Sequence, residues 1–360
     1  MATVSTERRG FGLGVGELTG AIGDSITVLP LVVALGLVTP ASLPQIFAGF
    51  AVFQVVWGAV YGVPLSVEPM KALAGLAIAG AISYGALVAA GLLAGAVLLA
   101  AGRLGLLSRV AAAIGEPVVC GVQFAVACLL VVAAADLVVA APAVAAAGVV
   151  LAASVAAVSR RAVAAVVLAA GVLWAVAVAG APVVSVPTLE PFPAGGPSLS
   201  AGVLEGTATQ LAMTVGNAAV ATSLLLSDLY DANVSPDRLA GSMGAMNLLA
   251  VPLGALPMCH GSGGLAGKHA FGARTATANA VAGGLYAVLA VASGLFEAFP
   301  MALLGVLLVA VAASLARVAL RATDRPPFVV AVGALAVATN VGVAFLAGAV
   351  WWLVRTRGFR

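Results

Sequence analysis

Long apolar stretches, separated by glycines, prolines and a few charged residues, run through almost the whole chain. A membrane-spanning helix needs about 20 predominantly apolar residues, and fewer when the helix is broken. By that criterion the first part of the chain predicts seven spans, near residues 12–37, 43–61, 64–82, 84–101, 115–135, 137–157 and 162–184. After a polar, proline-rich connector, seven more are predicted near residues 203–227, 238–254, 257–275, 277–294, 297–316, 326–338 and 340–356.

Composition supports a protein embedded almost entirely in the lipid bilayer. Of the 360 residues, 63% are hydrophobic and 8% are charged, and the mean hydropathy is +1.18. Soluble proteins carry about 25% charged residues. We therefore expect an all-α, polytopic integral membrane protein, in which the net charge of +3 does not indicate a nucleic-acid partner. The three cysteines lie in apolar or glycine-rich segments, so no disulfide framework is expected.

The arginines give the predicted spans a direction. With fourteen spans and a cytoplasmic N-terminus, no Lys or Arg falls in an outer loop, whereas Asp136, Glu190, Glu205 and Glu297 do. This is the positive-inside distribution of membrane proteins. The arginines on the cytoplasmic side are then Arg8, Arg9, Arg103, Arg109, Arg160, Arg161, Arg238, Arg274, Arg317, Arg321, Arg325, Arg355, Arg357 and Arg360. We expect both termini in the cytoplasm and the protein in the cytoplasmic membrane of a prokaryotic cell.

The two sets of spans match each other at a fixed offset of 193 residues. The aligned pairs are Glu17 with Gln210, Asp24 with Asn217, Gln54 with Asn247 and Pro64 with Pro257. Because seven is an odd number, the second copy enters the membrane upside down, which is the inverted repeat of secondary transporters. The predicted organisation is a first repeat over 1–184, a connector over 185–202 and an inverted second repeat over 203–360.

The third span of each repeat is predicted to be broken. Pro64 and Pro69 cannot donate backbone hydrogen bonds and disfavour helix before them, so we predict extended chain over Val63–Glu68 and helix from about Pro69 to about Ser83. At about 1.5 Å per residue such a helix covers roughly 21 Å, less than the roughly 30 Å apolar core of a bilayer. The other copy opens with Pro257 and a glycine-rich run. Inversion then makes the two half-helices meet, N-terminus to N-terminus, at the midplane.

Facing helix N-termini predict an anion site, because each offers unpaired N–H groups and a partial positive charge. The predicted substrate-binding residues surround these two helix starts and one face of the eighth span: Ser66, Glu68, Lys71, Gln210, Thr214, Asn217, His260, Gly261, Ser262 and Gly263. Three roles stay open at this point. Lys71 either attracts the anion or forms an ion pair with Glu68 or Asp24. The Thr214 hydroxyl and the His260 ring either donate to the substrate or pack the broken segments.

Several stretches resemble a known family. "GELTGAIGDSITVLP", "VEPMKALAGLAI", "QLAMTVGNAAVA" and "GALPMCHGSGGLAGKHAFGART" are similar to the molybdate transporter branch of the sulfate permease (SulP) superfamily. The resemblance covers both repeats. It implies a seven-plus-seven fold with a core domain of spans 1–4 and 8–11 and a gate domain of the other six. Few residues follow the last span, so no STAS domain is expected, which favours the molybdate branch over sulfate permeases proper. That branch reads Val-Gln-Pro-Met-Lys where this chain has Glu68.

Transport of a dianion needs a driving force. Entry into a cell at about −100 mV costs roughly 4.6 kcal/mol for two charges. Buried carboxylates take up protons more readily than carboxylates in water, so Glu17, Asp24 and Glu68 are the predicted proton-coupling residues, with sodium as the alternative coupling ion. Lys268 and Arg274, farther along the tenth span, are predicted to lie at the inner surface.

The expected function is secondary active uptake of a tetrahedral oxyanion, with the resemblance favouring molybdate and leaving sulfate and tungstate open. A nucleobase-type permease of the same fold is an alternative, although Gln210 and Asn217 lack the carboxylates expected there. A membrane-embedded enzyme using Cys259 and His260 is least favoured, because sequence neighbours diverge and no third orienting group is evident. The same two residues lack a second cluster at ligand spacing, so no metal site or cofactor is expected. A homodimer remains open.

Overall fold

Seven membrane-crossing segments follow one another in each half of the chain. The computed structural model describes residues 12, 14–107, 115–160, 162–181 and 184–357. The first half contains α1 (Val15–Val38), α2 (Leu43–Tyr61), β1 (Val67–Pro69) with α3 (Lys71–Ile78), α4 (Tyr84–Leu104), α6 (Glu116–Ala140), α7 (Pro142–Val158) and α8 (Val163–Ala179). Five of the arginines used to predict the orientation lie outside the described residues: Arg8, Arg9, Arg109, Arg161 and Arg360.

The second half repeats this order. It contains α9 (Ala201–Met213), a π-helix (Thr214–Ala221) and α10 (Thr222–Tyr230) as one crossing, then α11 (Pro236–Ala250), β2 (Met258–His260) with α12 (Ser262–Ala270), α13 (Thr277–Val291), α14 (Met301–Arg321), α15 (Pro326–Ala338) and α16 (Val341–Arg357). The segments agree with the predicted spans, although several ends differ by several residues. The largest shifts are five residues, at the ends of α6, α8, α12 and α14 and at the start of α7.

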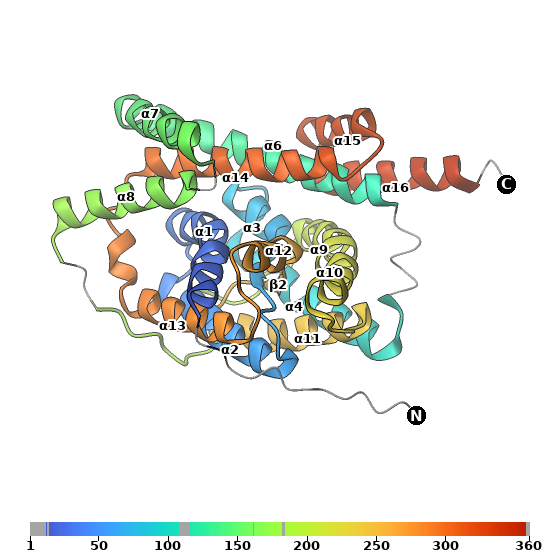
Figure 1. Cartoon of the computed structure of the whole chain (residues 1–360). Helices are drawn as coiled ribbons and strands as arrows, with labels where there is room; N and C mark the ends of the chain where they lie inside the picture. Colours follow the sequence, from blue (N-terminus) through green and yellow to red (C-terminus); the bar gives the residue numbers. More distant parts are fainter. Residues whose placement is uncertain (1–11, 13, 108–114, 161, 182–183, 358–360) are drawn as a thin grey trace.

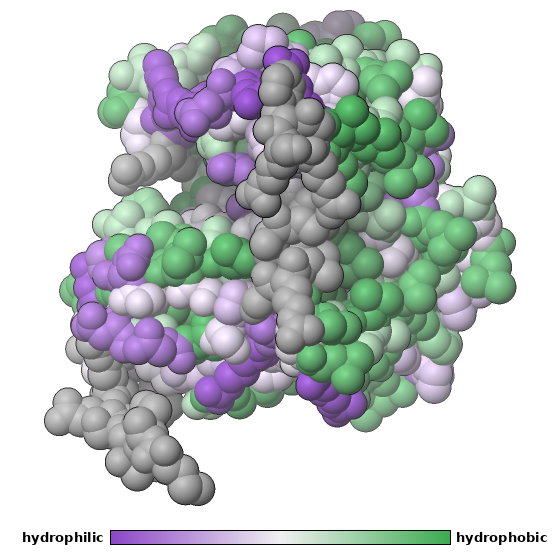
Figure 2. All heavy atoms as spheres, turned by 90° about the vertical axis from the view of Figure 1, so that its right-hand side faces the viewer, coloured by the Kyte–Doolittle hydropathy of each residue, from purple (hydrophilic) through white to green (hydrophobic). Residues whose placement is uncertain are grey.

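The helices form two layers (Figure 1). Helices α6, α7, α8, α14, α15 and α16 lie together on one side, and the remaining helices with the two strands form the other layer. This is the predicted division into a gate and a core. Six of the described helices are long and apolar enough to cross a membrane, and five shorter apolar helices accompany them. Figure 2 shows broad apolar areas on one face of the molecule, as expected of a surface against lipid.

Within the core layer, the two repeats pack against each other through small residues. Helix α4 of the first repeat meets α11 of the second, where a Cβ on Gly244 would lie 2.4 Å from the Leu99 backbone nitrogen. Helix α2 meets α13 in the same way, with a Gly283 Cβ 2.9 Å from the Ala51 carbonyl oxygen. Small residues allow such close approach of helices in membranes. The two broken spans are therefore held between helices contributed by both halves.

The broken spans contain a feature that the sequence pattern did not predict. Strands β1 and β2 pair antiparallel, with Val67 opposite His260, Glu68 opposite Cys259 and Pro69 opposite Met258. The half-helix of the first repeat is also shorter than predicted, because it begins at Lys71 instead of Pro69 and ends at Ile78 instead of Ser83. The early end follows from Gly80, whose φ of 68° lies in the left-handed region that stops a helix.

Candidate anion site between the two broken spans

A cavity lies where the two broken spans meet the eighth span. Its volume is about 40 Å³, which is room for about three water molecules at roughly 10–15 Å³ each. The lining residues are Glu68, Lys71, Gln210, Met213, Thr214, Asn217, Ala218, Cys259, His260, Gly261, Ser262 and Gly263. The structure therefore brings together every predicted substrate-binding residue except Ser66.

Glu68 lies at the N-terminus of α12. Its side chain is 2% exposed, and its Oε1 accepts a hydrogen bond of 2.8 Å from the Gly264 N–H. Its Oε2 pairs with the Lys71 Nζ at 2.5 Å, which is one of the two roles left open for Lys71. A carboxylate belonging to the first repeat thus occupies the helix end of the second repeat, at the position where an oxyanion would bind.

The N-terminus of α3 is satisfied differently. The N–H groups of Ala72 and Leu73 donate to the Gln210 Oε1 at 3.0 and 3.3 Å. The Gln210 Nε2 donates in turn to the Thr214 Oγ1 at 3.0 Å. A neutral amide, fixed by its own hydroxyl partner, therefore caps this helix.

Asn217 connects the cavity to the gate. Its Oδ1 accepts a hydrogen bond of 3.4 Å from the Ser262 hydroxyl, and its Nδ2 donates to the Gln123 Oε1 on α6 at 3.0 Å. Gln123 is buried, and its own Nε2 donates to the Leu315 carbonyl on α14 at 3.1 Å. Asn217 lies in the π-helical part of the eighth span, and π-helical turns are frequent at functional sites.

The His260 ring turns away from the cavity. Successive side chains of a strand point to opposite faces, so His260 lies opposite to its neighbour Cys259, which is paired with Glu68. The ring nitrogen Nε2 lies 2.8 Å from the Ser242 Oγ, and the ring packs edge-on against Trp57 and Tyr61. Of the two roles left open for His260, the contacts therefore support packing, and its main chain is the part left to line the cavity.

The glycines at the start of α12 differ in how much space surrounds the position of a Cβ atom. A Cβ on Gly263 would meet nothing within 4 Å, so this glycine borders open space. A Cβ on Gly261 would lie 2.1 Å from the Glu68 carboxyl group. A Cβ on Gly264 would lie 2.3 Å from the Asp24 Oδ1 and the Ser66 Oγ, and 2.5 Å from the Glu68 Oε1. Gly261 and Gly264 are thus required by the carboxylates beside them.

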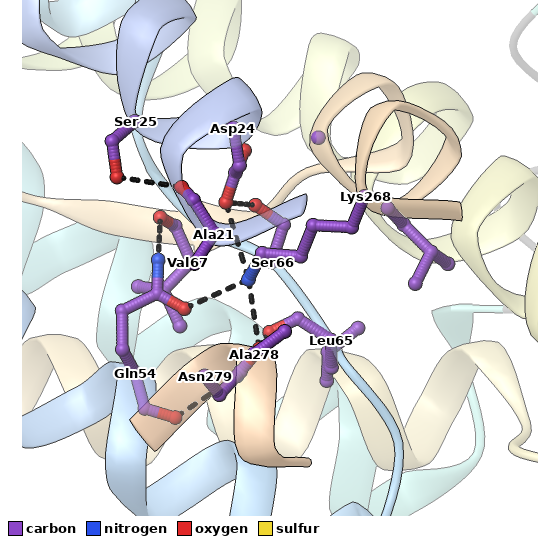
Figure 3. A network of polar contacts seen from close by, with 12 residues as sticks. Ala21, Asp24, Ser25, Gln54, Leu65, Ser66, Val67, Lys268, Ala278 and Asn279 are labelled. Carbon is purple, nitrogen blue, oxygen red and sulfur yellow. Dashed lines mark hydrogen bonds and ion pairs between the residues drawn. The ribbon is translucent and has the colours of Figure 1, made fainter. Parts of the chain in front are cut away.

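A buried polar network next to β1 joins α1, α2, α12 and α13 (Figure 3). The Asp24 Oδ2 accepts a hydrogen bond of 2.5 Å from the Ser66 hydroxyl and lies 3.2 Å from the Lys268 Nζ. The Lys268 Nζ also donates to the Gln54 Oε1 at 3.2 Å and to the Asn279 Oδ1 at 2.7 Å. Ser66, predicted to bind substrate, is not among the residues that line the cavity, and its hydroxyl instead donates to Asp24.

The prediction that Lys268 lies at the inner surface is wrong. Its side chain is 0% exposed, and all three of its donor hydrogens have acceptors. Charged residues inside a membrane are costly and require partners, and here one carboxylate and two amides supply them. Lys268 does lie in the last turn of α12, but its side chain faces Asp24, Gln54 and Asn279 instead of the membrane surface.

Glu17 has a different position from the other two carboxylates predicted to carry protons. Its Oε1 accepts hydrogen bonds of 3.0 Å from the Arg274 and Thr275 N–H groups, and its Oε2 accepts one of 3.2 Å from the Ala278 N–H. Glu17 therefore caps the start of α13, away from the cavity lining. Its role in proton coupling stays a prediction, whereas Asp24 and Glu68 lie beside each other around Gly264.

Two residues of the site were not predicted from the sequence. Asn279 donates to the Gln54 and Leu65 carbonyls at 2.9 and 2.6 Å and holds the extended chain before β1. Gln123 reaches the site from the gate. Both are single amides in apolar helices, and a rule that treats every intramembrane polar side chain as a candidate would have found them. Among the described residues, no group of three or more His, Cys, Asp or Glu side chains is placed to hold a metal ion.

The cavity beside two half-helix starts and the two-layer arrangement suit a membrane transporter for anions. The sequence comparisons give the family. A family model described as "Molybdate transporter of MFS superfamily" matches residues 16–130 and 202–315, which lie in the two repeats. Molybdate transporter 1 of Arabidopsis thaliana is 30% identical over 406 residues, covering 94% of this chain and 87% of the relative. This chain belongs to the molybdate transporter family, as its motifs predicted.

Other relatives agree. Molybdate transporter 2 of Arabidopsis thaliana is 27% identical and covers 81% of this chain and 76% of its own. The transmembrane domain of the cyanobacterial bicarbonate transporter BicA superposes with a TM-score of 0.64 at 18% identity, covering 92% of this chain and 96% of that one. Murine SLC26A9, an anion transporter, gives 0.70 at 11% identity, with 96% of this chain and 69% of that one covered. These likenesses confirm the predicted seven-plus-seven inverted-repeat fold.

Proposed function

We propose that this protein takes up molybdate, with sulfate and tungstate as competing tetrahedral dianions, and that uptake is coupled to protons. The names of the relatives support the substrate. The observation that carries the proposal is the Glu68 carboxylate at the N-terminus of α12, held by the Gly264 N–H and by Lys71. A site that stabilises one carboxylate with a helix N-terminus and a lysine is chemically suited to an oxyanion.

Substrate and carboxylate compete for the same groups. An ionised Glu68 beside a dianion is repulsive, at roughly 4 kcal/mol per pair of unit charges 4 Å apart with an effective dielectric constant of 20. Protonation of Glu68 removes that repulsion. It also frees the Lys71 ammonium and the Gly264 N–H for the anion, and the carboxylic acid then donates a hydrogen bond where the family's Gln offers an amide. The proton on Glu68 then travels with the substrate.

The direct test is uptake of labelled molybdate into proteoliposomes, with an acidic outside and with unlabelled sulfate or tungstate as competitor. We expect uptake that is driven by the pH difference and reduced most by the competitor of closest size. Vesicles without the protein are the control. An absence of uptake for all three dianions would remove the proposal.

Glu68→Gln tests the coupling. Because protonation of Glu68 accompanies binding, molybdate affinity in the unaltered protein should fall as the pH rises. The variant needs no proton at this position, so its binding should lose much of the pH dependence and become tighter than that of the unaltered protein above neutral pH. Glu17→Gln, at the start of α13, is the control and should keep the pH profile. A pH profile unmoved in Glu68→Gln would transfer the coupling to Asp24 or Glu17.

The orientation of the molecule belongs to the same proposal. The one-sided arginines support cytoplasmic termini, and the division into 1–184, 185–202 and 203–360 is the corresponding domain organisation. With this orientation, uptake runs against an inside-negative potential, which is the reason that coupling is required.

A further inference from the structure

Four charged side chains lie together around Gly264 and the start of α3. Glu68 pairs with Lys71 at the cavity, and Asp24 pairs with Lys268 in the polar network next to β1. Two carboxylates and two ammonium groups leave this cluster neutral when the cavity is empty. A bound dianion adds two negative charges to a region from which water is largely excluded, where unbalanced charge is expensive.

The two carboxylates are neighbours rather than separate sites. The Asp24 Oδ1 and the Glu68 Oε1 both lie within 2.5 Å of the point that a Gly264 Cβ would occupy. The Asp24 Oδ1 is buried and has no hydrogen-bond partner among the described residues. Neutralisation of either carboxylate relieves the repulsion between them, and the unpartnered oxygen of Asp24 is where a proton can be added without breaking a hydrogen bond.

The two lysines can keep their charges when the carboxylates become neutral. The Lys268 Nζ retains the Gln54 and Asn279 side-chain oxygens, two acceptors that do not depend on the charge of Asp24. Lys71 is partly exposed to the cavity, with 30% of its side chain accessible, and gains the dianion as a partner. Other titratable groups face the cluster and are uncharged near pH 7: Tyr230, Tyr286 and Cys259.

We infer that each dianion crosses with two protons, one added to an oxygen of Glu68 and one to the Asp24 Oδ1, so that transport is electroneutral. This inference rests on the proposed oxyanion uptake. With both carboxylates neutral, the Lys71 and Lys268 ammonium groups balance the dianion, and the loaded cluster has the same net charge as the empty one. Both O–H bonds form from protons on the outer side and break when the protons leave to the cytoplasm with the anion.

The experiment measures molybdate accumulation in proteoliposomes while the membrane potential is set with potassium and valinomycin. Accumulation should be the same at 0 and −100 mV, and each unit of pH difference should raise it about a hundredfold, as expected for two protons at tenfold each. Uptake that occurs but weakens at inside-negative potential, or rises only tenfold per pH unit, overturns the inference and leaves the proposed function standing. A complete absence of uptake would instead count against the proposed function.

Single substitutions test which residues carry the two protons. Glu68→Gln removes one proton site, so one negative charge enters per cycle and −100 mV should lower accumulation about fiftyfold relative to 0 mV. Asp24→Asn should do the same if the protein folds with Lys268 held by its amides alone. Glu17→Gln, outside the cluster, should keep the dependence of two protons. Accumulation by Glu68→Gln that ignores the potential would contradict the assignment.

Discussion

The two half-helices face the same cavity, yet their N-termini are satisfied by groups of different character. Helix α3 donates to Gln210, a neutral amide whose other end is fixed by Thr214. Helix α12 donates to Glu68, an ionised carboxylate whose other oxygen faces Lys71. A neutral cap can remain in place when an anion arrives, whereas a negative one must be neutralised or displaced. We therefore expect α12 to bind the substrate and α3 mainly to supply Lys71.

The supports behind the two extended segments show what the repeats share. Gln54 and Asn247, which align at the offset of 193 residues, each hold the strand of their own repeat. The Gln54 Nε2 donates to the Val67 carbonyl at 3.0 Å, and the Asn247 Nδ2 donates to the Met258 carbonyl at 2.7 Å. Symmetry is broken at Lys268, whose partner by the same offset is Gly75. The scaffold is therefore symmetric, and the charge is not.

The opposite orientation of the two repeats predicts an all-or-none difference in labelling. Single cysteines would be placed at Asp136, Ser198, Glu297, Arg160 and Arg321, all exposed, in a chain whose native cysteines are replaced by Ser. We expect an impermeant thiol reagent to label the first three positions from outside and the two arginine positions only from inside. Reversed accessibility in either repeat would contradict the inverted arrangement.

Gly264→Ala should give the next largest effect. Its methyl group would collide with Asp24, Ser66 and Glu68, so we expect molybdate uptake to fall by at least about a hundredfold, the effect of roughly a 1 Å misplacement in a functional site. Gly263→Val should also abolish uptake, for a different reason, because its side chain would fill the cavity without meeting protein atoms at Cβ. Stability of the two variants separates the reasons: Gly264→Ala should unfold more easily and Gly263→Val should not. Unchanged transport by a stable Gly263→Val protein would remove α12 from the site.

The two lysines test the broken symmetry of charge. Lys268→Met leaves Asp24 buried without its cation, which should lower the free energy of unfolding by about 3–5 kcal/mol. Lys71→Met removes a partly exposed partner of Glu68, whose carboxylate keeps the Gly264 N–H, and should therefore cost less than Lys268→Met. Thermal unfolding in detergent measures both. The double variant Lys268→Met/Asp24→Asn should recover much of the loss, and equal losses for the two single lysine variants would show that the ion pairs are equivalent.

Removal of the neutral cap should have the smallest effect. Gln210→Ala takes the acceptor from two N–H groups of α3, and loss of a helix cap typically costs about 1 kcal/mol. We expect a correspondingly small drop in unfolding free energy and uptake within a few-fold of the unaltered protein, with its pH dependence intact. A shifted pH profile in Gln210→Ala would show that α3 takes part in proton coupling.

The sequence was sufficient for those features that follow from length, charge and proline. The spans, their grouping into two repeats and the residues at both half-helix starts were predicted, because apolar length and backbone donors constrain them directly. The directions in which individual side chains point were not predicted. The His260 ring faces α11, a direction set by the pairing of its strand with β1, and Lys268 faces Asp24. That pairing joins residues far apart in the chain, so no local pattern signals it.

The pairing of β1 with β2 also imposes a delay between synthesis of the first strand and formation of the sheet. Pro69 and Cys259, neighbours in the sheet, are separated by 190 residues of chain. At synthesis rates of about 5–20 residues per second, the first strand waits roughly 10–40 s for its partner to leave the ribosome. During that interval the Ser66 carbonyl and the Met70 N–H lack their later partners, Gly261 and Pro257, in a medium that offers few substitutes. The extended segment of the first repeat therefore gains these backbone partners only after the second repeat has been synthesised.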